Sequence, residues 1–170
     1  NEFYEKALQL APDRPSIRSN YLYALNNLSS ISAKDLYESH KQWGQVYKSA
    51  EASKPLCRKK KNRKLKVGYV SPDFRRHSVS YFLEAFFANH NHQKFEITCY
   101  SNGILEDEVT ERLRKCVTQW RTIFGLPDAE AAQLISDDQI DILVDLSGHT
   151  MGNRLPLFAL KPAPVQVSYL

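Results

Sequence analysis

The fold of this chain is decided by the stretch KVGYVSPDFRRHSVSYFLEAFF, residues 66–87. Its first five residues are a short apolar run of the kind that predicts a β-strand. After a polar loop at 71–78, apolar residues recur at helical spacing, at Val79, Phe82, Leu83, Phe86 and Phe87. The stretch therefore predicts a strand, a loop and a helix, which is the repeating unit of an α/β fold.

The same alternation of strand and helix continues to the end of the chain. Apolar or alternating runs predict strands at 95–100, 120–124, 140–146 and 165–170, and helical spacing predicts helices at 109–117 and 127–135. Strands separated by helices of this length form right-handed crossovers and a parallel sheet. We therefore predict an α/β domain over 65–170, with a Rossmann-like parallel sheet and helices on both of its faces.

Residues 1–48 have a different, purely helical pattern. Apolar spacing predicts three short antiparallel helices, with a stop at Pro12 and a capping box formed by Ser32 and Asp35. The segment Tyr4–Pro12 resembles the closing helix of a tetratricopeptide repeat, a unit of about 34 residues that stacks into solenoids. The next unit is degenerate, with Leu22 where that repeat needs a small residue, as expected for the last repeat of an array. An ordinary amphipathic helical hairpin is the alternative.

The positive charge is concentrated between these two regions. Seven of the nine positions from Arg58 to Lys66 are Arg or Lys, although the net charge of the whole chain is only +4. Such a run can bind nucleic acid, but no aromatic residue lies within it to stack on a base, and no nucleic-acid-binding motif accompanies it. We therefore interpret 49–64 as a basic linker and treat nucleic-acid binding as the weaker alternative.

The composition is that of a globular intracellular protein. Apolar residues make up 42% of the 170, which excludes a wholly disordered chain. The spacing of Cys57, Cys99 and Cys116 fits neither a disulfide scaffold nor a cysteine zinc site, so we expect a reducing compartment, the cytoplasm, with the nucleus as an alternative. No apolar run approaches the roughly 18 residues that would cross a membrane. Because Asn1 stands in place of a methionine, we expect the natural chain to begin earlier.

Two polar loops follow strands that this topology places side by side. In an open parallel sheet, ligands bind at the carboxyl ends of the strands, where successive connections leave in opposite directions. For a Rossmann-like order this crevice lies between the loops 71–78 and 147–154. Each carries one histidine, His77 or His149, which could accept a hydroxyl proton or bind an anion; a surface or structural role is the alternative. Asp73, at the mouth of the crevice, could orient a neighbouring group.

Two common nucleotide-binding motifs are absent. Gly68 is not followed by G-x-G-x-x-G, and no G-x-x-x-x-G-K-[ST] occurs, which excludes ordinary dehydrogenases and P-loop NTPases. His90 and His92 invite a metal site, but no ligand-spaced cysteine pair or second histidine cluster supports one. We predict a polar turn at a helix end there.

Four separated motifs resemble a single family. They are VGYVSPDF at 67–74, HSVSYF at 77–82, DILVDLSGHT at 141–150 and PAPVQ at 162–166. Together they resemble the intracellular protein O-linked N-acetylglucosamine transferases, with their bacterial relatives and the plant SPINDLY-type protein O-fucosyltransferases. The resemblance spans roughly Leu65 to Leu170, and the repeat-like helices before it agree in order.

The resemblance implies a fold, a reaction and a set of site residues. It implies a GT-B enzyme, in which two Rossmann-like lobes follow a tetratricopeptide superhelix, and inverting, metal-independent transfer from a nucleotide sugar to Ser or Thr hydroxyls of proteins, with no cofactor. His77 matches an active-site histidine that has been proposed as a base. His149 and Thr150 match a loop near the sugar and acceptor, and Asp73 is expected close by. Some animal members have Tyr at the position of His149, which argues against obligatory proton transfer by this residue.

The family chain continues into a second lobe, which holds most donor contacts and the basic groups that stabilise the leaving diphosphate. Because such stabilisation is commonly the largest catalytic contribution, we expect these 170 residues to be inactive alone. We predict a fragment of a transferase that moves N-acetylglucosamine from UDP-GlcNAc to proteins. Transfer of fucose from GDP-fucose and a non-catalytic protein-binding module are the alternatives. The expected partners are the nucleotide sugar and acceptor proteins bound through the repeats, and no membrane.

Overall fold

The structure, a computed structural model, describes residues 2–12, 14–47 and 63–169. These residues form two compact units, one containing the described residues up to 47 together with 149–151, and the other containing the rest. Of the basic linker predicted at 49–64, all but Arg63 and Lys64 lie outside the described residues. Among the helices that are described, none is both long enough and apolar enough to cross a membrane.

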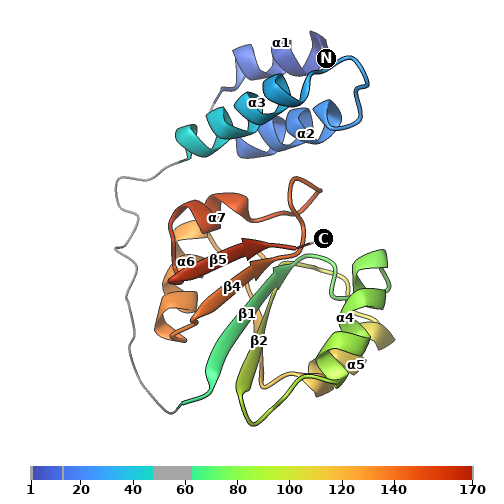
Figure 1. Ribbon diagram of the computed structural model, residues 1–170, viewed down its shortest axis with the longest axis vertical. Coiled ribbons are helices and arrows are strands. Elements are labelled where there is room, and N and C mark those ends of the chain that lie inside the picture. Colours follow the sequence, from blue (N-terminus) through green and yellow to red (C-terminus); the bar gives the residue numbers. More distant parts are fainter. Residues whose placement is uncertain (1, 13, 48–62, 170) are drawn as a thin grey trace. The chain divides into compact units, whose positions relative to one another are not determined.

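Three helices build the first unit, α1 (Glu2–Leu10), α2 (Pro15–Leu25) and α3 (Ala33–Val46), as the apolar spacing predicts (Figure 1). Pro15 occupies the first position of α2, where its fixed φ and missing N–H are tolerated. Ser32 caps α3, since its hydroxyl accepts the backbone N–H of Asp35 at 3.1 Å. Leu22 and Leu25 are buried along α2.

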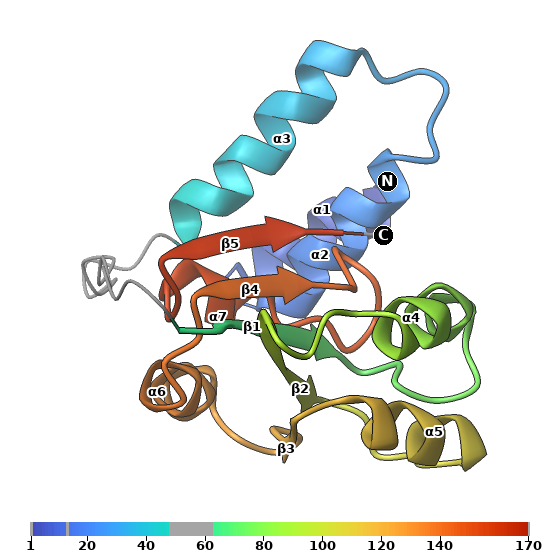
Figure 2. The same cartoon turned by 60° about the horizontal axis from the view of Figure 1, so that its bottom comes forward.

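The second unit is built on five parallel strands: β1 (Leu65–Ser71), β2 (Phe95–Ser101), β3 (Gln119–Thr122), β4 (Ile142–Asp145) and β5 (Val165–Ser168). Their order is β3-β2-β1-β4-β5, and every adjacent pair is parallel. Figure 2 shows β3 and β5 at the two edges of this sheet. The predicted α/β class is confirmed, and the direction of the connections reverses between β1 and β4, where the Rossmann-like order places it.

Four helices cover the two faces of the sheet: α4 (Ser78–Ala88), α5 (Glu108–Cys116), α6 (Asp128–Asp137) and α7 (Leu155–Ala159). In Figure 1, α4 and α5 lie on one face and α6 and α7 on the other. Alternate residues of β1 supply the two cores, because successive side chains of a strand point to opposite faces. Tyr69 belongs to the core that contains Leu83 and Phe87 of α4, whereas Val70 belongs to the core that contains Ile135 of α6.

Gly68 has a packing role at the centre of β1. A Cβ at this position would lie 2.8 Å from Cε2 of Tyr100 and 3.0 Å from Cδ1 of Leu143. These side chains come from the strands on either side of β1, so they meet over a position that has no side chain. This close approach explains a glycine that no dinucleotide fingerprint accompanies.

Candidate functional site

The loops that follow β1, β2 and β4 meet at the carboxyl edge of the sheet. The Asn102 backbone N–H donates to the Ser71 carbonyl at 2.9 Å, and its side-chain amide donates to the Gly152 carbonyl at 2.8 Å. A Cβ on Gly103 would lie only 2.4 Å from the carbonyl oxygen of Pro72, and one on Gly152 only 2.9 Å from Cβ of Pro72. The predicted ligand edge is therefore a contiguous surface made by three loops.

His77 is the N-cap residue of α4. Its Nδ1 accepts the backbone N–H of Val79 at 3.3 Å, and a neutral imidazole that accepts at Nδ1 carries its proton on Nε2. Nδ1 lies 4.0 Å from Oδ2 of Asp73, beyond hydrogen-bond distance, while Oδ1 of Asp73 accepts from the Arg75 guanidinium at 3.0 Å. With its side chain 37% exposed, His77 can offer an N–H donor to a ligand at this edge.

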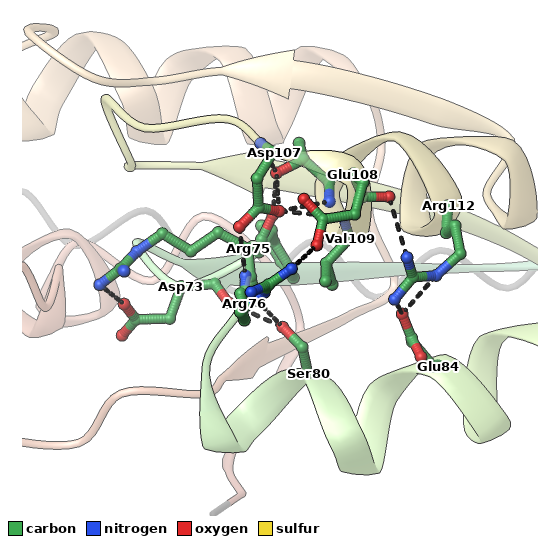
Figure 3. Close-up of polar contacts among 11 residues, drawn as sticks. Asp73, Arg75, Arg76, Ser80, Glu84, Asp107, Glu108, Val109 and Arg112 are labelled. Carbon is green, nitrogen blue, oxygen red and sulfur yellow. Dashed lines mark hydrogen bonds and ion pairs between the residues drawn. The ribbon is translucent and has the colours of Figure 1, made fainter.

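The loop that carries Asp73 and His77 is held to the start of α5 by hydrogen bonds, several of which are drawn in Figure 3. The Asp107 carboxylate accepts the Arg76 backbone N–H at 2.7 Å and also caps α5. The Thr110 hydroxyl donates to the Phe74 carbonyl at 2.7 Å. The bond from the Arg76 N–H, followed by those from the first turn of α5, lowers the pKa of Asp107. We call this set of bonds the Asp107–Thr110 clasp.

A small cavity lies beside His77, between the first turns of α4 and α5. Its volume is about 150 Å³. Two ion pairs contribute to its lining, Arg76 with Glu108 and Arg112 with Glu84, all drawn in Figure 3. Ligand pockets commonly have volumes of ~300–1,000 Å³, so this cavity alone cannot enclose a nucleotide sugar.

Asp145 fixes the beginning of the loop after β4. The side chain is buried, and its carboxylate accepts the backbone N–H groups of Ser147 at 3.1 Å and Gly148 at 3.0 Å and the hydroxyl of Ser168 at 2.8 Å. Burial raises the pKa of Asp145, although the hydrogen bonds oppose this shift. This positioning role of Asp145 was not predicted from the sequence. The signal was present, because an Asp that precedes Ser and Gly at a strand end is typical of a side chain that bonds to the following backbone.

His149 and Thr150 lie in the stretch 149–151, which groups with the first unit. Nδ1 of His149 lies 3.0 Å from the Ser19 hydroxyl, and the ring contacts those of His40 and Trp43 at centroid distances of 5.0 and 5.3 Å. Burial, with a smaller contribution from His40, lowers the pKa of His149 to about 4. His149 is therefore neutral near pH 7 and supplies no positive charge there. Thr150 is exposed.

A doubly wound sheet with polar loops at its switch point defines a Rossmann-like ligand-binding lobe. Comparison with protein families identifies which one: residues 24–170 match the model described as glycosyl transferase family 41. The chain belongs to this family. The family resemblance inferred from the four sequence motifs is thereby confirmed.

Individual relatives agree with this assignment. The chain is 38% identical over 173 residues to a protein of Oryza sativa subsp. japonica named "Probable UDP-N-acetylglucosamine--peptide N-acetylglucosaminyltransferase SPINDLY"; the match covers 98% of this chain but 19% of that protein. The chain is also 33% identical over 120 residues to the SEC protein of Arabidopsis thaliana, which has the same enzyme description. That match covers 70% of this chain and 12% of the SEC protein. A solved mutant O-GlcNAc transferase of Thermobaculum terrenum superimposes with a TM-score of 0.90 at 37% identity, covering 98% of this chain and 32% of that one. The chain thus spans about a fifth of the length of the rice protein.

Proposed function

We propose that this chain is the first catalytic lobe, with the preceding repeat helices, of a protein O-glycosyltransferase that transfers N-acetylglucosamine from UDP-GlcNAc to Ser or Thr hydroxyls. The observation that carries the proposal is that the loops after β1, β2 and β4 meet at the carboxyl edge of the sheet. The names of the similar rice and Arabidopsis proteins support both the donor and a peptide acceptor. Acceptor proteins would bind through α1 to α3 and the repeats preceding them.

In the proposed inverting reaction, the acceptor hydroxyl oxygen forms a bond to the anomeric carbon of the sugar. The bond from that carbon to the diphosphate oxygen breaks, UDP leaves with the electron pair, and the hydroxyl proton passes to a base. We propose that no metal is required and that basic groups of a second lobe stabilise the leaving diphosphate. The free thiols of Cys99 and Cys116 are compatible with the reducing cytoplasm that we propose as its compartment.

His77 is the residue of this lobe that we place in contact with substrate. The proton on Nε2 makes the ring a hydrogen-bond donor, whereas a base acting through Nε2 would need that proton to move to Nδ1. Asp73, 4.0 Å from Nδ1, is the carboxylate beside that position. Because Nδ1 already accepts the Val79 N–H, the arrangement favours donation from Nε2 to the sugar or the acceptor over proton abstraction.

Replacement of His77 in the full-length protein tests this function. His77→Ala should lower kcat/KM for transfer from UDP-GlcNAc by about 100-fold or more, a usual loss for an essential acid–base or hydrogen-bonding group. His77→Asn keeps a capping oxygen and an amide donor, so it should remain within about tenfold of wild type if the ring only donates.

Each contrary outcome has a distinct meaning. An unchanged kcat/KM in His77→Ala would remove His77 from the mechanism. Transfer from GDP-fucose but not from UDP-GlcNAc would replace the donor. A full-length protein that shows neither saturable binding of a nucleotide sugar nor transfer would favour the non-catalytic binding module.

A further inference from the structure

We propose that Arg154 is a positioning residue, which anchors the end of the loop that carries His149 and Thr150 to the ligand edge of the lobe. Its kinetic consequence rests on the proposed function. Its structural consequence does not, because the anchoring is a property of the fold.

The guanidinium of Arg154 lies among acceptors of the protein itself. The side chain is only 11% exposed. Its Nε donates to Oδ1 of Asp128 at 2.7 Å, and its Nη2 donates to the carbonyl of Leu126 at 2.9 Å. Its Nη1 donates to Oδ1 of Asn102 at 3.1 Å and to the carbonyl of Ile123 at 3.3 Å.

These acceptors come from three different parts of the lobe. Asn102 follows β2, Ile123 and Leu126 lie between β3 and α6, and Asp128 is in the first turn of α6. Arg154 itself stands immediately before α7, at the end of the loop after β4. One side chain therefore joins that loop to the loops after β2 and β3 and to α6.

A second bond closes the same connection. Asn102, whose oxygen accepts from Arg154, donates through its side-chain nitrogen to the carbonyl of Gly152 at 2.8 Å. Asp145 holds the other end of the loop through the N–H groups of Ser147 and Gly148. Residues 149–151 thus lie between two anchored ends.

The bonding pattern distinguishes this role from ligand binding. Four of the five N–H donors of a guanidinium are used by protein acceptors, and Asp128 balances its charge. Lysine could not reproduce the pattern, because its ammonium is a single point of donation and the acceptors here surround a planar fork.

Hydrogen exchange in the full-length protein measures the anchoring directly. In Arg154→Lys and Arg154→Met, the backbone amides of 147–154 should exchange about tenfold faster or more, because the opening of a local segment sets its exchange rate. The amides of β1 should keep their wild-type rates. With an acceptor peptide and UDP-GlcNAc, both variants should lose about 10- to 100-fold in kcat/KM, the expected cost of a misplaced site.

Arg121→Met is the matched control. Arg121 also pairs with an aspartate of this lobe, Asp138, at 2.8 Å, but it lies on β3, and both hydrogen bonds of its side chain among the described residues go to that carboxylate. This variant should leave exchange in 147–154 unchanged. Asp128→Asn provides a second test that keeps Arg154 and removes its charge partner, with an intermediate increase in exchange expected.

The outcomes separate this inference from the proposed function. Wild-type exchange in 147–154 in both Arg154 variants would overturn the positioning role. If wild-type protein transfers no sugar, the proposed function fails while the exchange measurement still decides the anchoring. If Arg154→Met loses protection throughout the lobe, exchange in 147–154 of Arg154→Lys and Asp128→Asn decides whether Arg154 anchors the loop.

Discussion

At the scale of single residues, the two histidines of the ligand loops have different surroundings. His77 is partly exposed, caps α4 and lies beside Asp73. His149 packs against two aromatic rings, and its pKa of about 4 keeps it neutral near pH 7. His77 is therefore the better candidate for contact with a polar substrate group, and a charge-dependent role for His149 is not supported.

Gly103 offers a sharp test of the meeting of the loops. Gly103→Ala should destabilise the lobe by about 1–3 kcal/mol, the usual cost of overpacking, because the new Cβ would collide with a backbone carbonyl that has little freedom to move. Urea unfolding followed through the fluorescence of Trp120, which lies in this unit, measures the loss.

Gly44 is the matched control for this substitution. It lies inside α3, and a Cβ there would meet nothing within 4 Å. Gly44→Ala should stabilise the helical unit by about 0.5–1 kcal/mol through helix propensity, as followed by the fluorescence of Trp43. Equal stability of Gly103→Ala and wild type would contradict the close approach to Pro72.

At the scale of elements, the Asp107–Thr110 clasp couples the loop after β1 to α5. Asp107→Ala should lower the urea midpoint of the lobe at pH 7 and accelerate hydrogen exchange in 72–77, since it removes the acceptor of the Arg76 N–H. The depressed pKa of Asp107 sets the pH dependence. Its contribution is complete above the usual value of 3.8 and is lost as pH falls through the lower folded-state pKa.

The difference in midpoint between wild type and Asp107→Ala should therefore shrink on acidification below that range. Asp137→Ala is a suitable control, because this carboxylate accepts only from the Gln133 side chain among the bonds that the described residues show. A difference that grows as the pH falls would contradict a depressed pKa.

The cap of α3 provides a test in the helical unit. Ser32→Ala should cost about 1 kcal/mol, because it leaves the Asp35 N–H without its side-chain acceptor. Ser39→Ala should change stability by less than about 0.5 kcal/mol, since the hydrogen bond of this hydroxyl among the described residues goes back to the Asp35 carbonyl of the same helix. Fluorescence of Trp43 during urea unfolding measures both. An equal effect of the two substitutions would refute the capping role.

The periodicity of the sequence was sufficient to predict every strand and all helices except the short α7, but not the bonds that fix the site. The short apolar run from Val67 to Val70 signals β1, and the apolar spacing after it signals α4. His77 was expected in a ligand loop, yet its capping role was not, because Ser, Thr, Asp and Asn are the usual caps and Ser78 follows directly. Arg154 gave no signal, since its partners lie 26 to 52 positions away and only folding brings them together.

At the scale of the whole molecule, the described residues form two compact units, while the similar rice protein is about five times longer than this chain. We expect the 170 residues alone to transfer no sugar from UDP-GlcNAc to a peptide, whereas the full-length protein transfers it. Mass spectrometry of the peptide after incubation with each protein checks this. Transfer by the short chain alone would show that the lobe contains every group that the leaving diphosphate needs.

The two glycines that lie against Pro72, Gly103 and Gly152, set a practical limit on redesign of this lobe. In random libraries that include positions 103 and 152, a new side chain at either position would collide with Pro72. Met151 is 90% exposed and tolerates variation sterically. A search for altered specificity should therefore vary the loop after β4 around Met151 and keep both glycines unchanged.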